Sequence, residues 1–383
     1  MDRIIVAGPL AHPAMRAVLN LSAAEPLTLR GRLAGGQGAG IQRGAWPLLE
    51  TGGQRLHACR VTAAAELIRY AAIFELEPVT VDGERVFGVV DPVTCGTSEG
   101  QSAAVRQDTR TSDDKGSSDT DWPAGWDADL AATIAAHVVA QPADRSSGQI
   151  AARLPMIAGW CASRLRGQAR QVRSDNRQNV RHLAVREPYA GHFAVEEHRF
   201  QHRLHRGGWA DPVDRGVFVS SDAAVVLPWD PVRDRVLVVE QFRSGPAARH
   251  DPDPFILEPV AGRIDAGETP EATMLREAVE EAGITLDRLV PTPHYYPTPG
   301  IAAEFIYSFV GIADLPDGCT GIGGLPEEGE DIRGVLMERA DLVRRCLSGE
   351  IVSGPLLILA LWLDRNAQDL RQADAQAIER TTA

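Results

Sequence analysis

The sequence has almost no lysine, few cysteines and few aromatic residues, and it contains no long hydrophobic run. Lys115 is the single lysine among 39 basic residues, so the positive charge comes almost entirely from arginine. Acidic residues outnumber basic ones by 52 to 39, and the formal net charge is −13. Proteins that bind nucleic acids or anionic membranes generally need a positive face. The charge balance therefore predicts no nucleic-acid partner and no membrane partner.

The five cysteines are far apart and none forms a CxxC pair, which argues against a zinc knuckle or a thioredoxin-like centre. A sparse, odd-numbered set is typical of reduced thiols in the cytosol. The N-terminal apolar run is short and is broken by Pro9, so it is a poor signal peptide and a better first strand. The longest late apolar run, residues 356–363, is far shorter than the roughly 20 residues of a membrane helix. We therefore expect a soluble, cytoplasmic protein.

A chain of 383 residues, of which 44% are hydrophobic, is long enough for two domains with a core each. Residues 1–98 contain short strand-like runs and a hairpin signal at Asp82-Gly83, which predicts a small α+β domain. Residues 99–125 are polar and nearly free of large apolar side chains, so they predict a flexible linker. Apolar spacing over residues 126–186 predicts a helical connector.

The pattern changes to strands from residue 187, and residues 187–375 predict the second domain. Strands are expected at 192–205, 216–220, 223–228, 235–242, 304–310 and 331–337, and helices at 270–282, 340–348 and 355–370. Strands around one embedded helix, followed by terminal helices, predict an α/β/α sandwich around a mixed sheet. The whole chain is thus expected to be α/β (α+β), with the smaller α+β domain at its N-terminus.

The most informative segment is Glu258–Ile284, with the sequence EPVAGRIDAGETPEATMLREAVEEAGI. It fits the pattern GX5EX7REUXEEXGU, with all seven glycine, glutamate and arginine positions filled. Seven such positions coincide by chance in about one window in 10⁸ at average composition. Thr269 is a good N-cap, Pro270 suits the first helical position, and Gly283 can end the helix in a left-handed conformation. The motif therefore predicts a helix over residues 270–282.

Side-chain spacing divides this helix into faces. The apolar residues that are expected to face the sheet are Leu275, Ala278, Val279 and Ala282. Glu277 and Glu281 are four residues apart, so they are expected to project together from another side. Glu280 lies beside them and follows Arg276 by four residues, which predicts a salt bridge that orients the acidic cluster.

One alternative is an ordinary solvated acidic helix face, because exposed like-charge pairs cost only about 0.2–0.5 kcal/mol. That alternative leaves the preceding glycine loop unexplained. Gly262 and Gly267 allow the backbone to curl against the start of the helix, and the Ala261 carbonyl could then point at the same cation as the glutamates. Oxygen ligands of this kind suit Mg²⁺ or Mn²⁺. The segment therefore favours a site for a divalent metal ion over a solvated acidic face.

This motif resembles the Nudix hydrolase box. The resemblance implies cleavage of a nucleoside diphosphate linked to another moiety, in which divalent metals neutralise phosphate charge and a carboxylate orients the attacking water. Further elements resemble the ADP-ribose pyrophosphatase branch of that family. They are the run VVEQFR at 238–243, the Glu258-Pro259 step before the glycine loop, Pro299 sixteen residues after Gly283, and the acidic loop GLPEEGEDI at 324–332.

By position, the resemblance assigns a role to each of several residues. Those that would bind metal are Ala261, through its carbonyl, and Glu277, Glu281 and Glu330. Those that would act in catalysis are Arg276, Glu280 and Glu328, the last by orienting or deprotonating the water. Those that would contact the substrate are Arg243, Glu258 and Pro299. The implied reaction converts ADP-ribose, or a related nucleoside-diphosphate sugar, to AMP and a sugar phosphate with Mg²⁺ (or Mn²⁺). The branch also implies a homodimer, with residues 192–220 as the exchanged strands.

The N-terminal part is similar to γ-glutamylcyclotransferase-like (AIG2-like) domains, and the chain as a whole resembles Nudix proteins linked with bacterial tellurite resistance. Residues 4–10 lie where that domain family has its first strand and YG-S/T-L loop, and Glu75 lies where it has a catalytic glutamate. The loop here reads AGPL, so the tyrosine and the hydroxyl residue are missing, and Pro9 removes a backbone donor. We therefore expect a degenerate domain with Glu75 on its surface.

Two alternatives to a simple hydrolase remain open at this point. One is a module that keeps the fold and senses a nucleotide sugar, or binds a protein, without turnover. The complete set of glutamates argues against it, because a sensor has little need for a full metal cluster. The other is a bifunctional protein whose N-terminal domain also cyclises γ-glutamyl compounds through Glu75.

Overall fold

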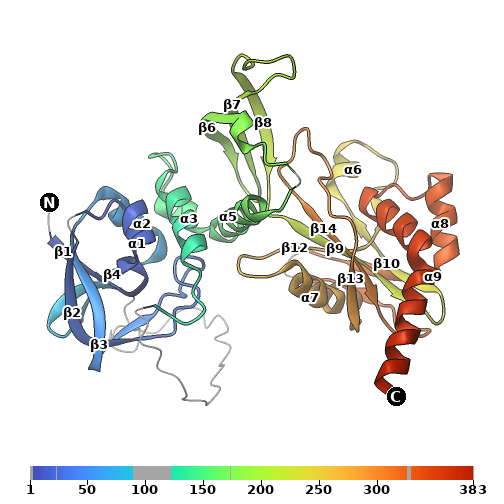
Figure 1. Cartoon of the computed structure of the whole chain (residues 1–383), viewed down its shortest axis with the longest axis horizontal. Coiled ribbons are helices and arrows are strands. Elements are labelled where there is room, and N and C mark those ends of the chain that lie inside the picture. Colours follow the sequence, from blue (N-terminus) through green and yellow to red (C-terminus); the bar gives the residue numbers. More distant parts are fainter. Residues whose placement is uncertain (1–2, 23, 89–121, 173, 326–328, 383) are drawn as a thin grey trace. The chain divides into compact units, whose positions relative to one another are not determined.

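The computed structural model describes residues 3–22, 24–88, 122–172, 174–325 and 329–382. It divides into two compact units, unit 1 (Met1–Gln168) and unit 2 (Ala169–Ala383), which are described separately (Figure 1). The predicted linker, residues 99–125, lies almost wholly outside the described residues. No helix in the described part of the chain is long and apolar enough to cross a membrane.

Unit 1 is built on a mixed sheet whose described strands follow the order β2-β3-β1-β5-β4. These strands are β1 (Arg3–Ala7), β2 (Glu25–Ala34), β3 (Leu48–Thr62), β4 (Glu77–Val81) and β5 (Glu84–Gly88). The β4–β5 hairpin turns at Asp82 and Gly83, whose φ angles of 50° and 79° meet the requirement of a type I′ turn for positive φ at both positions. The first strand and this hairpin confirm the prediction, whereas the sequence patterns do not predict β2 or β3.

The helices of unit 1 include part of the segment that was expected to be a connector. They are η1 (Gly8–Ala11), α1 (Pro13–Val18), α2 (Ala65–Phe74), α3 (Ala128–Val139), α4 (Ser147–Ala151) and α5 (Leu154–Ala169). Helix α3 packs on α1 and α2, with Leu130 and Ile134 buried. Trp126 donates its indole N–H to the Ala39 carbonyl at 2.8 Å. The compact unit therefore extends past the expected boundary at residue 98, because the apolar stripe of α3 needs a partner surface.

Unit 2 contains the α/β/α sandwich that the sequence predicts (Figure 1). The described strands of its central sheet are β9 (Ala223–Asp230), β10 (Arg235–Phe242), β11 (Phe255–Glu258), β12 (Val260–Arg263), β13 (Arg288–Pro291), β14 (Ile306–Ile312), β15 (Ile322–Gly323) and β16 (Ile332–Glu338). Six follow the order β13-β14-β9-β10-β16-β15, while β11 pairs with β10 and β12 with β9. The sheet is mixed, because β14 runs parallel to β9 and the other pairs are antiparallel.

The helices of unit 2 cover both faces of this sheet. They are α6 (Ser244–Ala248), α7 (Pro270–Ala282), α8 (Arg339–Ser348) and α9 (Gly354–Thr382). On β10, Val236 and Val238 join the core formed with α8 and α9, whereas Leu237 and Val239 join the core formed with α7. Successive side chains of a strand point to opposite faces. The sheet therefore separates α7 from α8 and α9 (Figure 1).

A separate three-stranded antiparallel sheet precedes the central one. Its strands are β6 (Val180–Ala190), which follows the short η2 (Arg177–Asn179), β7 (Ala194–His202) and β8 (Val213–Val219). Phe218 on β8 donates its N–H to the Ile301 carbonyl at 2.8 Å, and its own carbonyl accepts the Ala303 N–H at 3.0 Å. These bonds hold the loop that follows Pro299 against β8.

Candidate metal and catalytic site

Helix α7 begins and ends where the motif predicts. The Thr269 side chain accepts a hydrogen bond from the Ala272 N–H at 3.1 Å, and Gly283 ends the helix with a φ of 65°. The face that is turned to the sheet differs from the prediction, however. Leu275 and Val279 are 48% and 56% exposed. The expectation that these two residues face the sheet is therefore wrong.

The true inward face of α7 carries an acid. The buried residues of the helix are Thr273, Met274, Ala278, Glu281 and Ala282. Glu281 is only 4% exposed, and its Oε2 accepts a hydrogen bond from the Ala261 N–H on β12 at 3.0 Å. The helix is rotated so that the Glu281 carboxylate, and not Leu275 or Val279, lies against the strand.

Glu277 lies one helical turn earlier, against the same strand. A Cβ placed on Gly262 would be 2.0 Å from Glu277 Oε1 and 2.4 Å from its Cγ. A real Cβ never approaches a neighbour so closely, so this position accepts only glycine as long as Glu277 keeps its place. The glycine of the motif thus creates the space that the Glu277 side chain occupies.

The Ala261 carbonyl was predicted to share a cation with these glutamates. The N–H of Ala261 points toward Glu281, and β12 pairs with β9 along its other edge. The N–H and C=O of one residue leave an antiparallel strand on the same side. The Ala261 carbonyl therefore also faces the helix edge, where the two glutamates lie.

Glu330 reaches the same cluster from a distant part of the chain. Its charge raises the pKa of both Glu277 and Glu281. Its Oε2 accepts the Leu325 N–H at 3.1 Å, and its own N–H donates to the Leu325 carbonyl at 3.2 Å. The structure therefore places Glu330 within electrostatic reach of Glu277 and Glu281, while Glu328 lies outside the described residues.

The cluster holds more negative charge than its surroundings compensate. Burial raises the pKa of Glu277 to about 7 and that of Glu281 to about 8, and repulsion among the carboxylates adds to both shifts. Among the described residues, no group of three or more acidic, histidine or cysteine side chains is already arranged to hold an ion. The oxygen donors and their uncompensated charge nevertheless fit a hard divalent cation.

Arg276 connects the acidic residues of the motif. Its guanidinium donates to Glu268 at 3.1 and 3.2 Å, to Glu277 at 2.8 Å and to Glu280 at 2.9 Å. Glu268 also accepts the Thr273 hydroxyl at 2.9 Å. The predicted pair between Arg276 and Glu280 is present, but the arginine is shared among three carboxylates. Arg276 is thus placed to orient Glu277.

Of the three residues predicted to contact the substrate, two form an ion pair with each other and the third lies in a separate loop. Arg243, directly after β10, donates to Glu258 at the end of β11 at 2.5 Å. The charge of Arg243 also lowers the pKa of Glu281, so this guanidinium lies within electrostatic reach of the acidic cluster. Pro299 lies in the exposed loop that β8 holds.

One acid beside the site was missed by sequence reasoning. Glu304 is half-buried, and burial and the charge of Asp222 raise its pKa, while Arg263 and Arg243 oppose the shift. The signal that could have found it is a lone acid in the otherwise apolar run AAEFIYSF. An acid at such a position requires a partner, and the structure supplies two nearby arginines.

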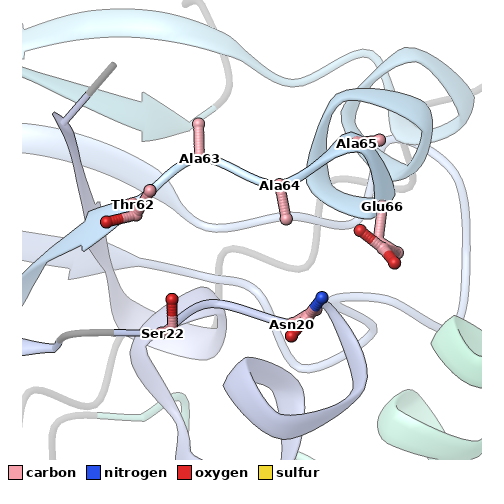
Figure 2. Close-up of a pocket in the computed structure, with 7 residues that line it drawn as sticks. All are labelled: Asn20, Ser22, Thr62, Ala63, Ala64, Ala65 and Glu66. Carbon is pink, nitrogen blue, oxygen red and sulfur yellow. The ribbon is translucent and has the colours of Figure 1, made fainter. Parts of the chain in front are cut away.

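In unit 1, Glu75 lies on the surface. It ends α2 in the left-handed region with a φ of 56°, its side chain is 67% exposed, and it forms an ion pair with Arg43. The last three residues of the AGPL loop lie in η1, whose residues are all buried. A pocket of about 400 Å³ lies at the opposite end of α2, where the side chains of Asn20, Ser22, Thr62 and Glu66 line it (Figure 2). Glu75 is therefore not part of this pocket.

Comparison with known proteins places the site in a family. The model of the NUDIX domain matches residues 220–345, which lie within unit 2. The ADP-ribose pyrophosphatase of Escherichia coli (strain K12) is 36% identical over 195 residues, which are 51% of this chain and 92% of the relative. That of Haemophilus influenzae is 34% identical over 211 residues, 54% of this chain and 96% of the relative. The GDP-mannose pyrophosphatase of Enterobacter sp. (strain 638) is 28% identical over 149 residues, 39% of this chain and 76% of the relative. This chain therefore belongs to the Nudix family.

Proposed function

We propose that this protein hydrolyses the diphosphate bond of ADP-ribose, giving AMP and ribose 5-phosphate, with Mg²⁺ or Mn²⁺ as the cofactor. One observation carries the proposal: the half-buried Glu277 and the buried Glu281 lie beside the Gly262 strand, within electrostatic reach of Glu330 from a separate loop. The two relatives of highest identity named above are both ADP-ribose pyrophosphatases, which supports the choice of substrate.

The chemistry divides between the cation and the protein side chains. Glu277, Glu281, Glu330 and the Ala261 carbonyl would hold a divalent ion, which would neutralise charge on the diphosphate oxygens. Glu328 would accept a proton from water as the water oxygen bonds to one phosphorus. The bond from that phosphorus to the bridging oxygen breaks, and the leaving phosphate keeps the electron pair. Arg276 would keep Glu277 in its ligating orientation.

Substrate contacts are proposed for the side of the site that carries Arg243. Its guanidinium is held by Glu258 and lies near Glu281, so it can offer its remaining N–H groups to a phosphate. Glu304 and the loop that begins at Pro299 would line the sugar side. Glu280 pairs with Arg276 and would support the cluster from outside.

A substrate panel tests the proposal. Purified protein with Mg²⁺ or Mn²⁺ is offered ADP-ribose, other ADP-sugars and GDP-mannose, and AMP or GMP release is measured. ADP-ribose should be the best substrate, and Glu281→Gln should lose most activity while staying folded. Glu271→Gln is the matched control, because Glu271 is exposed on the first turn of the same helix. A wild type that is inactive on the whole panel would overturn the proposal, and tight ADP-ribose binding without turnover would favour a sensing module.

Several finer statements complete the proposal. We propose that the protein is cytoplasmic and forms a homodimer. Exposed apolar side chains on β6 support an interface at this strand, namely Val180, Leu183, Val185 and Tyr189. The mass in solution tests this. We also propose that unit 1 is a degenerate γ-glutamylcyclotransferase-like domain, of the type found in tellurite-resistance Nudix proteins. The exposed position of Glu75 supports the loss of activity, and 5-oxoproline formation that Glu75→Gln abolishes would contradict it.

A further inference from the structure

The loop that carries Glu330 is attached to the C-terminal end of α7. The last turn of the helix ends with two bonds, from the Gly283 N–H to the Val279 carbonyl and from the Ile284 N–H to the Ala278 carbonyl, both at 3.0 Å. This pattern leaves the Glu280 carbonyl without a partner from the helix. The Gly324 N–H donates to that carbonyl at 3.0 Å. A main-chain bond thus joins the loop to the helix that carries Glu277 and Glu281.

Gly323 makes the approach possible. It is the last residue of β15, and a Cβ at this position would lie 2.2 Å from the Glu281 carbonyl oxygen and 2.7 Å from the Glu281 carbonyl carbon. Both atoms belong to the helix backbone, so the clash could not be relieved by a side-chain movement. Any residue other than glycine would push the loop away from the end of the helix.

Gly324 then turns the chain toward Glu330. Its φ of 91° lies in the left-handed region that glycine adopts at low cost. A Cβ at Gly324 would be 2.7 Å from Glu330 Cβ, so the glutamate packs directly on the glycine backbone. The Leu325 N–H, one residue later, donates to the Glu330 carboxylate at 3.1 Å.

We infer that Gly323 and Gly324 are positioning residues, and that together they fix the distance between Glu330 and the two glutamates of α7. This pair of residues is called the glycine clasp below. The clasp contacts the backbone of Glu280 and Glu281. The position of the loop carboxylate is therefore set by the same helix backbone that carries the other two carboxylates. The inference rests on the proposed function only in assigning a reaction to the cluster. The clasp itself acts on cation binding.

The test compares Gly323→Ala and Gly324→Ala with Gly321→Ala. Gly321 precedes the same strand, has no atom within 4 Å of a built Cβ and does not have a positive φ, so it is the matched control. Mn²⁺ affinity is measured by electron paramagnetic resonance of free Mn²⁺, and kcat and KM are measured with ADP-ribose. Misplacement by about 1 Å can cost about 100-fold in rate. Each clasp variant should therefore lose about 100-fold in kcat and bind Mn²⁺ more weakly, with KM nearly unchanged, while Gly321→Ala resembles the wild type.

A double-variant cycle separates positioning from general destabilisation. In a Glu330→Gln background, Gly323→Ala should add little further loss of kcat or Mn²⁺ affinity, because the residue that it positions is already disabled. Losses that multiply would overturn the inference, and so would wild-type Mn²⁺ affinity in folded Gly323→Ala. If Gly323→Ala does not fold, as judged by circular dichroism, the same cycle is run with Gly324→Ala. A wild type without hydrolase activity would refute the proposed function, while the Mn²⁺ measurements would still decide on the clasp.

Discussion

Glu281 on α7 accepts a hydrogen bond from the backbone N–H of Ala261 on β12, at 3.0 Å, with only 4% of the glutamate exposed. The two residues belong to the same sequence motif, 20 positions apart. A single hydrogen bond from a backbone N–H only partly offsets the cost of burying a carboxylate. The site is therefore built at a cost in stability that protons or a divalent cation can offset.

The first prediction concerns stability in the absence of metal. The folded pKa values of Glu277 and Glu281 are about 7 and about 8, compared with a usual value of 4.5. Between the usual pKa of 4.5 and the folded values of about 7 and 8, the folded protein binds more protons than the unfolded chain. The free energy of unfolding therefore falls as the pH rises through this range. With EDTA present, Tm should fall between pH 5 and 8, by about 2–4 °C for each kcal/mol lost. Differential scanning calorimetry at several pH values measures this.

Two comparisons accompany that experiment. Saturating Mg²⁺ should flatten the pH dependence, because the cation replaces the protons that the carboxylates would otherwise bind. Glu281→Gln should flatten it as well, because the amide cannot titrate. A wild-type Tm that rises steadily with pH in EDTA would contradict the expected direction of the shifts.

The second prediction concerns Gly262. Gly262→Ala places a methyl group where the Glu277 carboxylate lies, so Glu277 should be displaced from the cluster. We expect about 1–3 kcal/mol of destabilisation from overpacking, and a loss of activity of about 100-fold or more. Urea unfolding and steady-state kinetics measure the two effects. Gly354→Ala is a control, since nothing lies within 4 Å of its Cβ position, and unchanged kinetics for Gly262→Ala would show that Glu277 does not act from this place.

Sequence signals were reliable where they were local. Helix α7 and strand β10 have the predicted bounds. The caps at Thr269 and Gly283 act within a few residues, and β10 contains the uninterrupted apolar run Val236–Val239. The rotation of α7 about its axis could not be predicted in the same way. Hydrophobicity places Leu275 inside and Glu281 outside, whereas the contact with Ala261 requires the opposite.

Long-range relationships were the other feature that local patterns could not supply. Glu330 approaches α7 from a loop that is about 50 positions away in sequence. Only the family resemblance predicted this long-range approach. Glu304 was missed because its arginine partners are distant in sequence. Similarly, α3 joins unit 1 although a polar segment separates it from β5, because packing on α1 and α2 decides its place.

The third prediction concerns Arg276, whose guanidinium forms ion pairs with three carboxylates. Arg276→Lys keeps the charge but cannot bridge Glu268, Glu277 and Glu280 at once. We expect weaker Mn²⁺ binding and a kcat lowered by about tenfold or more, since Glu277 loses its fixed orientation. Arg365→Lys, at an exposed position of α9, is the control. Equal kinetics for the two variants would show that one positive charge near Glu277 is sufficient.

The fourth prediction concerns Arg243 and its partner Glu258. Their contact joins the ends of β10 and β11 beside the acidic cluster. A planar guanidinium can hold a carboxylate with one N–H group and bind a phosphate in bidentate geometry with others, whereas an ammonium group is a point charge without this fork. Arg243→Lys should therefore raise KM for ADP-ribose by about tenfold, while Mn²⁺ affinity without substrate stays near that of the wild type. Arg249→Lys serves as the control, because Arg249 lies on the exposed segment after α6 and pairs only with Asp251 among the described contacts. A lysine variant with weaker Mn²⁺ binding and an unchanged KM would instead show that Arg243 supports the metal ligands and does not contact the substrate.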